Sequence, residues 1–228
     1  MILAGVVRVN GARSEKAGTR IAADARIEVS GNSAKYASRA GFKLEGALED
    51  FGVAAAGKTC LDIGSSTGGF TDCLLQHGAR RVYAVDVTPE QMAWRLQQDA
   101  RVTQIKENAR NLHPGQIPEP SDIVTLDVSF ISAAKVLPAV VAAAGPAAEY
   151  LILVKPQFEL DRKDIGAGGI VRDPLLHEKA IERVREAAIA AGLTVDGVQP
   201  SKVTGAEGNQ EFFLHAWKKP PEEISAED

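Results

Sequence analysis

A glycine-rich segment and two carboxylates are the residues of this chain best suited to bind a small molecule. The segment Leu61-Asp62-Ile63-Gly64-Ser65-Ser66-Thr67-Gly68-Gly69-Phe70 follows a short apolar run, and Asp62 stands two residues before its first glycine. Glycines at such a turn let a ligand approach the backbone. Asp86 closes the next apolar run, at the spacing of an acid that accepts hydrogen bonds from ribose hydroxyls. The pattern predicts a nucleotide-type site.

The residues within the turn favour S-adenosylmethionine over a dinucleotide. Ser66 replaces the central glycine of the dinucleotide pattern G-x-G-x-x-G. Asp62 suits a ligand with an ammonium group, and Asp86 suits one with a ribose. The alternative is a tight strand-to-helix turn that binds nothing. The predicted cofactor contacts are Asp62, Gly64, Ser65, Ser66, Gly68, Gly69, Phe70, Asp86, Val87, Asn108, Ala109 and Asp127.

Four other charged residues occupy positions that are costly for a charge. Lys43 interrupts an apolar helical pattern, Asp127 and Lys155 each end an apolar run, and Glu211 opens the last one. In a doubly wound sheet we expect the last three to converge at one rim, where an unpaired charge is unfavourable. Each residue alone is equally well explained as a solvated helix position or a strand end. Their combination indicates a reactive site.

The elements that would position these residues alternate between strands and helices. Apolar runs predict strands at about 59–63, 81–85, 102–105, 122–126, 150–154, 194–200 and 211–217. Helical spacing predicts a helix capped by Ser38 and ended by Gly52, and further helices at about 69–77, 90–97, 132–143 and 175–191. A long polar loop is expected at 156–174. This alternation predicts an α/β fold, a doubly wound and mostly parallel seven-stranded Rossmann-like sheet that binds ligands at the carboxyl ends of its strands.

The first residues differ in character from the rest of the chain. Residues 1–31 contain a strand-like run, the hairpin signal Asn10-Gly11 and an excess of arginine and lysine over acids. We expect a small appendage at 1–31, a linker at 32–35, the main domain at 36–217 and a disordered, charged tail at 218–228.

Composition limits the remaining possibilities. The net charge of −4 argues against a generally basic nucleic-acid binder, so any nucleic-acid surface must be a local patch. The two cysteines and four histidines lack metal-ligand spacing, and we predict no metal. The chain has no apolar run of membrane-spanning length and no signal-peptide pattern, which predicts a cytoplasmic protein without membrane contact.

The ordered set Lys43, Asp127, Lys155 and Glu211 resembles the Lys-Asp-Lys-Glu tetrad of the FtsJ-like ribose 2′-O-methyltransferases. More closely, the chain resembles the hemolysin-A-like (TlyA) family of ribosomal RNA 2′-O-methyltransferases. That likeness covers residues 36–217 through SRAGFKL, LDIGSSTGGFTDCLL, VTLDVSFIS, LVKPQFE and GGIVRDP. Residues 5–29 resemble the second half of the RNA-binding domain named after ribosomal protein S-four. The first half of that domain is absent, so the chain is expected to start within it.

The resemblance implies a reaction and a set of partners. A ribose 2′-hydroxyl attacks the cofactor methyl in line, Lys155 accepts or steers the hydroxyl proton, Asp127 orients Lys155, and Lys43 and Glu211 complete the network. The expected partners are ribosomal RNA or ribosomal subunits, with no obligate protein partner. Asp161 and Ala167 depart from the family pattern in the loop after Lys155, where the resemblance implies a glycine and a basic residue. The expected RNA-binding residues are Arg8, Asn10, Arg13, Lys16, Arg39 and Arg172.

Three other functions compete with this one. An enzyme that methylates messenger-RNA caps needs aromatic residues to stack the base, and only 5% of this chain is aromatic. A non-catalytic RNA-binding or ribosome-assembly factor would not require the tetrad, which is complete here. A hemolysin would need a secretion signal, a spanning segment or a strongly amphipathic cationic helix, and the sequence provides none of them.

Overall fold

The computed structural model describes residues 7–13, 19–22, 24–29, 35–205 and 208–219. Contacts between residues divide the chain into two compact units, Met1–Lys35 and Tyr36–Asp228. The second unit contains the predicted cofactor loop and all four members of the tetrad. The domain boundaries expected from the sequence remain a proposal.

The first unit contains a small antiparallel sheet. Its strands are β1 (Val7–Val9), β2 (Ala12–Arg13) and β3 (Ile27–Val29), in the order β2-β1-β3. Asn10 and Gly11 connect β1 and β2 with φ angles of 50° and 81°, which confirms the predicted hairpin turn. Three short strands do not identify an RNA-binding domain, so the likeness to the S-four domain stays a prediction.

The second unit is built on a seven-stranded sheet with the order β6-β5-β4-β7-β8-β10-β9. Its strands are β4 (Thr59–Ile63), β5 (Arg81–Asp86), β6 (Val102–Lys106), β7 (Ile123–Leu126), β8 (Ala148–Val154), β9 (Thr194–Pro200) and β10 (Phe212–Lys218). The first five are parallel, and β10 runs antiparallel to both of its neighbours. The predicted fold class is confirmed.

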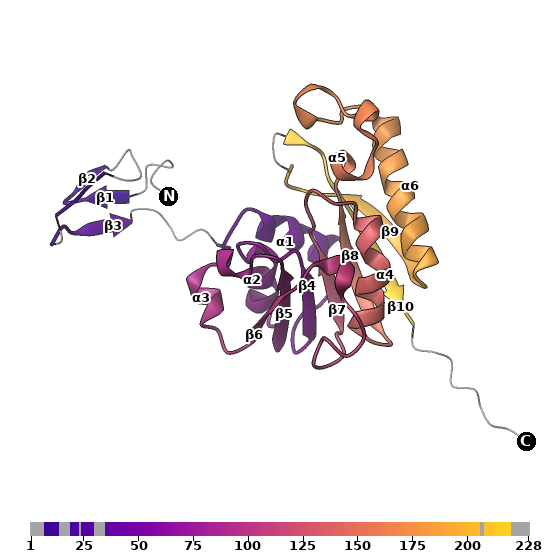
Figure 1. Cartoon of the computed structure of the whole chain (residues 1–228), viewed down its shortest axis with the longest axis horizontal. Coiled ribbons are helices and arrows are strands. Elements are labelled where there is room, and N and C mark those ends of the chain that lie inside the picture. The colour runs from indigo at the N-terminus through magenta and orange to yellow at the C-terminus, as the bar shows by residue number, and fades with distance from the viewer. Residues whose placement is uncertain (1–6, 14–18, 23, 30–34, 206–207, 220–228) are drawn as a thin grey trace, which may run out of the picture. The chain divides into compact units, whose positions relative to one another are not determined.

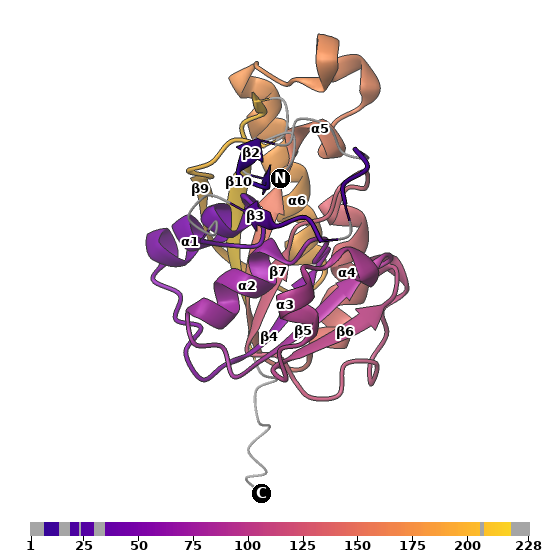
Figure 2. The same ribbon diagram turned by 90° about the vertical axis from the view of Figure 1, so that its left-hand side faces the viewer.

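Helices cover both faces of this sheet, as Figures 1 and 2 show. The main ones are α1 (Ala40–Phe51), α2 (Gly69–Gln76), α4 (Ala133–Ala144) and α6 (Pro174–Ala190). The shorter ones are η2 (Pro89–Gln91), α3 (Trp94–Gln97), η3 (Ala109–Asn111), α5 (Pro156–Glu159), η4 (Arg162–Asp164) and η5 (Ala167–Gly169). One buried apolar cluster lies under α4 and α6, and a second lies under α1 and α2. The apolar sides of the helices therefore form the two cores.

The strand order determines where the charged residues meet. The chain leaves β4 toward β5 on one side and later returns to β7 on the other, so the carboxyl end of β4 lies at a topological switch point. Because β10 is antiparallel to β8, Phe212 at its start is paired with Val154 at the end of β8. Glu211 and Lys155, the residues next to this pair, therefore reach the same rim of the sheet.

Three local expectations differ from the structure. The single helix predicted at about 90–97 is two short ones, η2 and α3, separated by Met92 and Ala93. Ser38 does not cap α1: Arg39 precedes the helix and no side chain caps it, whereas Gly52 ends it in the expected left-handed conformation. The segment after Lys155 is not a plain loop, because it contains α5, η4 and η5. No helix among the described residues is long and apolar enough to cross a membrane.

Candidate active site

The glycine-rich turn packs against the backbone that follows β7. Gly64 has a φ of 82°, and a Cβ atom there would collide with the carbonyl oxygen of Asp127. A Cβ on Gly69, at the start of α2, would collide with the hydroxyl of Ser38. These two glycines are therefore required by contacts within the protein. The packing brings the predicted cofactor loop against the strand end that carries Asp127.

Asp62 lies behind this turn and does not face a cavity. Its side chain is fully buried, and its two carboxylate oxygens accept hydrogen bonds from Thr71 Oγ1 at 2.7 Å and Thr125 Oγ1 at 2.9 Å. Burial raises the pKa of Asp62 to about 6, although both threonine bonds oppose that shift. Its predicted contact with a ligand ammonium group stays a prediction. In this conformation Asp62 ties β4 to α2 and β7.

A cavity of about 530 Å³ lies at the carboxyl ends of β4, β5 and β7. Asp86 forms part of its wall; its carboxylate accepts hydrogen bonds from the backbone N–H groups of Ser66 and Thr88, each at 2.9 Å. These bonds fix the carboxylate at the edge of the loop. The predicted cofactor residues that line this cavity are Gly64, Ser66, Asp86, Val87, Asn108, Ala109 and Asp127.

A second, smaller cavity of about 130 Å³ adjoins the same turn. Its predicted residues are Gly64, Ser65, Ser66, Gly69, Phe70, Asp127 and Lys155, and Gly68 lines neither cavity. Ser65 Oγ is buried and makes no hydrogen bond to any residue that the structure describes. Such an orphaned hydroxyl is unfavourable unless a ligand or water satisfies it. The polar small cavity and the larger one fit the amino-acid end and the nucleoside of S-adenosylmethionine.

The four tetrad residues form two ion pairs. Lys155 Nζ lies 2.5 Å from Asp127 Oδ1 and donates a hydrogen bond to Ser129 Oγ at 2.9 Å. Lys43 Nζ, on α1, lies 2.6 Å from Glu211 Oε2. The side chain of Glu211 is only 2% exposed, so it would be a costly charge without this partner. The sequence prediction that these charges need partners at the rim is therefore consistent with the structure.

Glu159 holds the segments after β7 and β8 together. Its carboxylate accepts hydrogen bonds from Ser132 Oγ at 2.5 Å and from the backbone N–H of Ala133 at 2.6 Å, at the start of α4. Arg183 on α6 donates to the Glu159 carbonyl oxygen at 2.5 Å. The segment after Lys155 is thereby fixed to the segment after Asp127. Burial raises the pKa of Glu159, and these hydrogen bonds oppose the rise.

Phe130 is an unexpected member of the site. Its φ is 64°, which is rare for a residue with a side chain, and the side chain is 93% exposed beside the larger cavity. Its ring centroid lies 5.4 Å from that of Phe158. The sequence pattern VTLDVSFIS contains Phe130 but gives no sign that it points outward. Ser38, Ser129 and Glu159 were likewise not predicted as site residues. They stand within the quoted motifs, but those motifs do not show which way their side chains point.

The predicted RNA-binding residues are spread over both units. Arg39 and Arg172 are exposed in the second unit. In the first unit Arg8 is exposed, Asn10 Oδ1 accepts a hydrogen bond from the Arg26 backbone N–H, and Arg13 lies in β2. Lys16 lies outside the described residues. Within the described chain no three His, Cys, Asp or Glu side chains could together hold a metal ion, and the absence of a metal stays a prediction.

Comparisons with known proteins agree with this architecture. The chain is 44% identical over 216 residues to 16S/23S rRNA (cytidine-2′-O)-methyltransferase TlyA of Mycobacterium tuberculosis, covering 94% of this chain and 81% of that protein. It is 43% identical to Hemolysin A of Brachyspira hyodysenteriae, covering 94% and 90%. The solved structure of a proposed hemolysin from Streptococcus thermophilus superposes with a TM-score of 0.79 at 40% identity, covering 99% and 84%. The sequence profile of the FtsJ-like methyltransferases matches residues 36–218, and the chain belongs to that family.

Proposed function

We propose that this protein is an S-adenosylmethionine-dependent ribose 2′-O-methyltransferase that acts on ribosomal RNA. The observation that carries the proposal is the position of the Lys155–Asp127 ion pair. Asp127 lines both cavities and Lys155 lines the smaller one, so the pair lies where the two cavities meet. The named activity of the Mycobacterium tuberculosis relative supports the choice of ribosomal RNA.

The residues of both cavities suit the proposed cofactor. Asp86 would accept hydrogen bonds from the ribose hydroxyls, and Asn108 and Ala109 would lie near the adenine. Ser65, whose hydroxyl has no described partner, would bind the amino-acid end. When bound, S-adenosylmethionine supplies an electrophilic methyl group on a positively charged sulfur, and this transfer needs no metal.

Residues of the tetrad would position the incoming 2′-hydroxyl and assist the loss of its proton. Lys155 Nζ lies next to the reacting oxygen beside Asp127. As a neutral amine it would accept the hydroxyl proton, and as an ammonium group it would stabilise the negative charge on that oxygen while the proton passes to solvent water. Asp127 and Ser129 hold Lys155 from two sides, which fixes its direction. Lys43 neutralises Glu211 beside the end of β8, so that the rim next to Lys155 keeps a fixed geometry.

Phe130 offers a surface for the target base. An exposed aromatic ring beside a catalytic rim is suited to stack on an unpaired nucleobase, which is how proteins commonly hold single-stranded RNA. Phe158 supports the ring from one side. In this arrangement the base would lie on Phe130 while its ribose points toward Lys155.

The test is transfer of a labelled methyl group from S-adenosylmethionine to purified ribosomal subunits and to free ribosomal RNA. We expect the label at a ribose 2′-oxygen, located by mapping the modified nucleotide. A Lys155→Ala variant serves as the inactive control. Binding of the cofactor without label in any ribosomal RNA would contradict the proposal and would favour a non-catalytic assembly factor.

A further inference from the structure

A second hollow lies beside the larger cavity, next to α5 and the start of α4. It has a volume of about 350 Å³ and adjoins the larger cavity, with which it shares wall residues, among them Arg110 and Phe130. Lys135, Phe158, Asp161 and Arg183 also line it. We call this space the side hollow. It is not required for the cofactor contacts described above.

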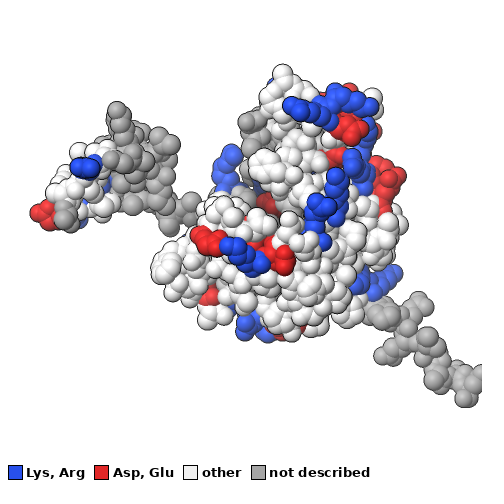
Figure 3. Space-filling view, in the orientation of Figure 1, with Lys and Arg blue, Asp and Glu red and all other residues white. Residues whose placement is uncertain are grey.

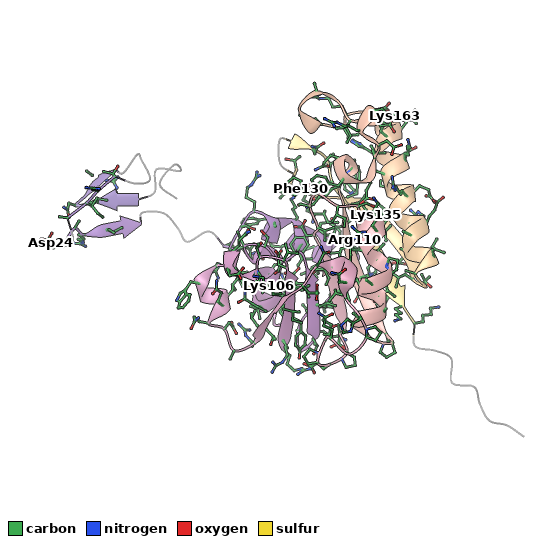
Figure 4. All side chains as sticks on the ribbon, in the orientation of Figure 1. Asp24, Lys106, Arg110, Phe130, Lys135 and Lys163 are labelled. Atoms are coloured by element: carbon green, nitrogen blue, oxygen red, sulfur yellow. The ribbon has the colours of Figure 1, made fainter. Side chains whose placement is uncertain are left out.

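Two cations at the side hollow have no acidic partner. Arg110 and Lys135 are both exposed, and neither forms an ion pair with any residue in the described part of the chain. Elsewhere in the second unit many exposed cations are paired, as Lys106 is with Glu90 and Lys179 with Asp164. Figure 4 labels Phe130, Lys135 and Arg110 near one another, and Figure 3, in the same orientation, has a blue patch there.

The carboxylates of the side hollow do not cancel this charge. Glu159 is only 2% exposed, and both its oxygens accept hydrogen bonds from the start of α4. Arg183 donates to a backbone carbonyl there. Asp161 is the remaining acid, and it is exposed at the rim. With Arg110, Lys135 and Arg183 against Glu159 and Asp161, the wall of the side hollow has three cations and two acids, which leaves it suited to an anion.

The side hollow lies close to Lys155, and this position favours a phosphate of the RNA backbone as the anion. Phe158 lines it, and Lys155 Nζ lies 5.9 Å from the centroid of that ring. In RNA the 3′-phosphate is attached to the ribose carbon next to the one that bears the 2′-hydroxyl. A ribose whose 2′-oxygen faces Lys155 therefore keeps its 3′-phosphate close to Lys155, and the side hollow, which has two cations unpaired among the described residues, is an adjoining space that could receive it.

We propose that the side hollow binds the backbone phosphate on the 3′ side of the methylated nucleotide, with Arg110 and Lys135 supplying the positive charge. The inference rests on the proposed function and adds to it a contact that fixes the ribose rather than the base. It also gives Asp161 a role: its negative charge at the rim weakens the attraction for the phosphate.

The test compares three single substitutions in the whole chain. Lys135→Gln, which does not touch the cofactor cavity, should raise the KM for ribosomal RNA about two- to five-fold, the range expected for one exposed ion pair. It should also lower the slope of log KM against log salt concentration by about 0.7 to 0.9. Asp161→Asn should lower the KM. Lys58→Gln, at an exposed lysine just before β4 and so at the opposite end of the strands, is the matched control and should change neither quantity.

Two results would overturn the inference. The first is a Lys135→Gln variant whose KM and salt slope equal those of the unmodified chain. The second is a Lys58→Gln variant whose KM and salt slope change as much as those of Lys135→Gln. Filter binding of ribosomal RNA in the same salt series measures the contact without turnover. If the unmodified chain transfers no methyl group to RNA, the proposed function fails, whereas wild-type transfer with an unaffected Lys135→Gln variant rejects the side hollow alone. Cofactor affinity, measured by calorimetry, should be the same for all three variants.

Discussion

Lys155 is the residue whose removal best separates chemistry from binding. A Lys155→Ala variant loses the cation that faces the 2′-hydroxyl, and we expect methyl transfer to fall about 10²- to 10⁴-fold, the usual contribution of a positioned acid–base group. Cofactor affinity should stay within a few-fold. The rate is measured by methyl transfer to ribosomal RNA, and Lys179→Ala, at a lysine on α6 that is also paired with an aspartate, is the control. Full turnover by Lys155→Ala would remove this residue from the mechanism.

A substitution of Asp86 tests cofactor binding, whereas the substitution of Lys155 tests catalysis. An Asp86→Ala variant loses the predicted bonds to the ribose hydroxyls, and we expect cofactor binding to weaken by about 1.5–3 kcal/mol, the range for a hydrogen bond to a charged group. Asp86 also accepts bonds from the Ser66 and Thr88 backbone, so the melting temperature must be measured beside the calorimetric affinity. Unchanged affinity in a folded variant would mean that the ribose is held by other residues.

For helices and strands, the apolar periodicity of the sequence predicted most positions well, but it did not predict which side chains contact one another. The strand predicted at 59–63 and the C-terminal glycine of α1 agree with the structure, because apolar spacing and a left-handed glycine are local properties. Ser38 was wrongly predicted as a cap, because its contact, the Gly69 turn, comes from another part of the chain. The hydrogen bond between Asp62 and Thr125 was not foreseen for the same reason. The convergence of Lys155 and Glu211 could be expected only once a strand order was assumed.

The three strands β8, β9 and β10 are joined by a buried histidine. His215 is 3% exposed; its Nε2 lies 2.8 Å from Glu149 Oε1, and its Nδ1 lies 3.1 Å from Asp196 Oδ2. Burial opposes the charged ring, but the hydrogen bonds to both carboxylates outweigh it and raise the pKa of His215. A raised folded-state pKa stabilises the fold fully below the unfolded value of about 6.5, and this stabilisation is lost as the pH rises through the folded value.

We therefore expect the contribution of His215 to the free energy of unfolding to decline as the pH rises above about 6.5. A His215→Gln variant should lack that decline. The measurement is the free energy of unfolding in denaturant at several pH values, for the unmodified chain and for the variant. His113→Gln removes an exposed histidine and serves as the control. If the pH dependence is the same in the chain and in His215→Gln, another group causes it.

At the scale of the whole molecule, charge is divided unequally between the two units. Residues 1–35 contain six Lys and Arg against three Asp and Glu, although the complete chain has a net charge of −4. The second unit is therefore strongly acidic as a whole, and its cations at the side hollow act only locally. Because phosphate contacts supply much of the affinity for nucleic acids, the first unit is the expected source of longer-range attraction to RNA.

Removal of residues 1–32 should test whether the first unit attracts RNA while the second unit alone binds the cofactor. The second unit contains the whole seven-stranded sheet and both cavities, so we expect unchanged cofactor affinity. The KM for ribosomal RNA should rise, and its salt dependence should become flatter by about 0.7 to 0.9 for each phosphate that the shortened chain no longer neutralises. If residues 1–32 only brace the second unit, the shortened chain will instead show the original salt slope at lower thermal stability. A salt titration of methyl transfer, combined with a melting curve, distinguishes the two outcomes.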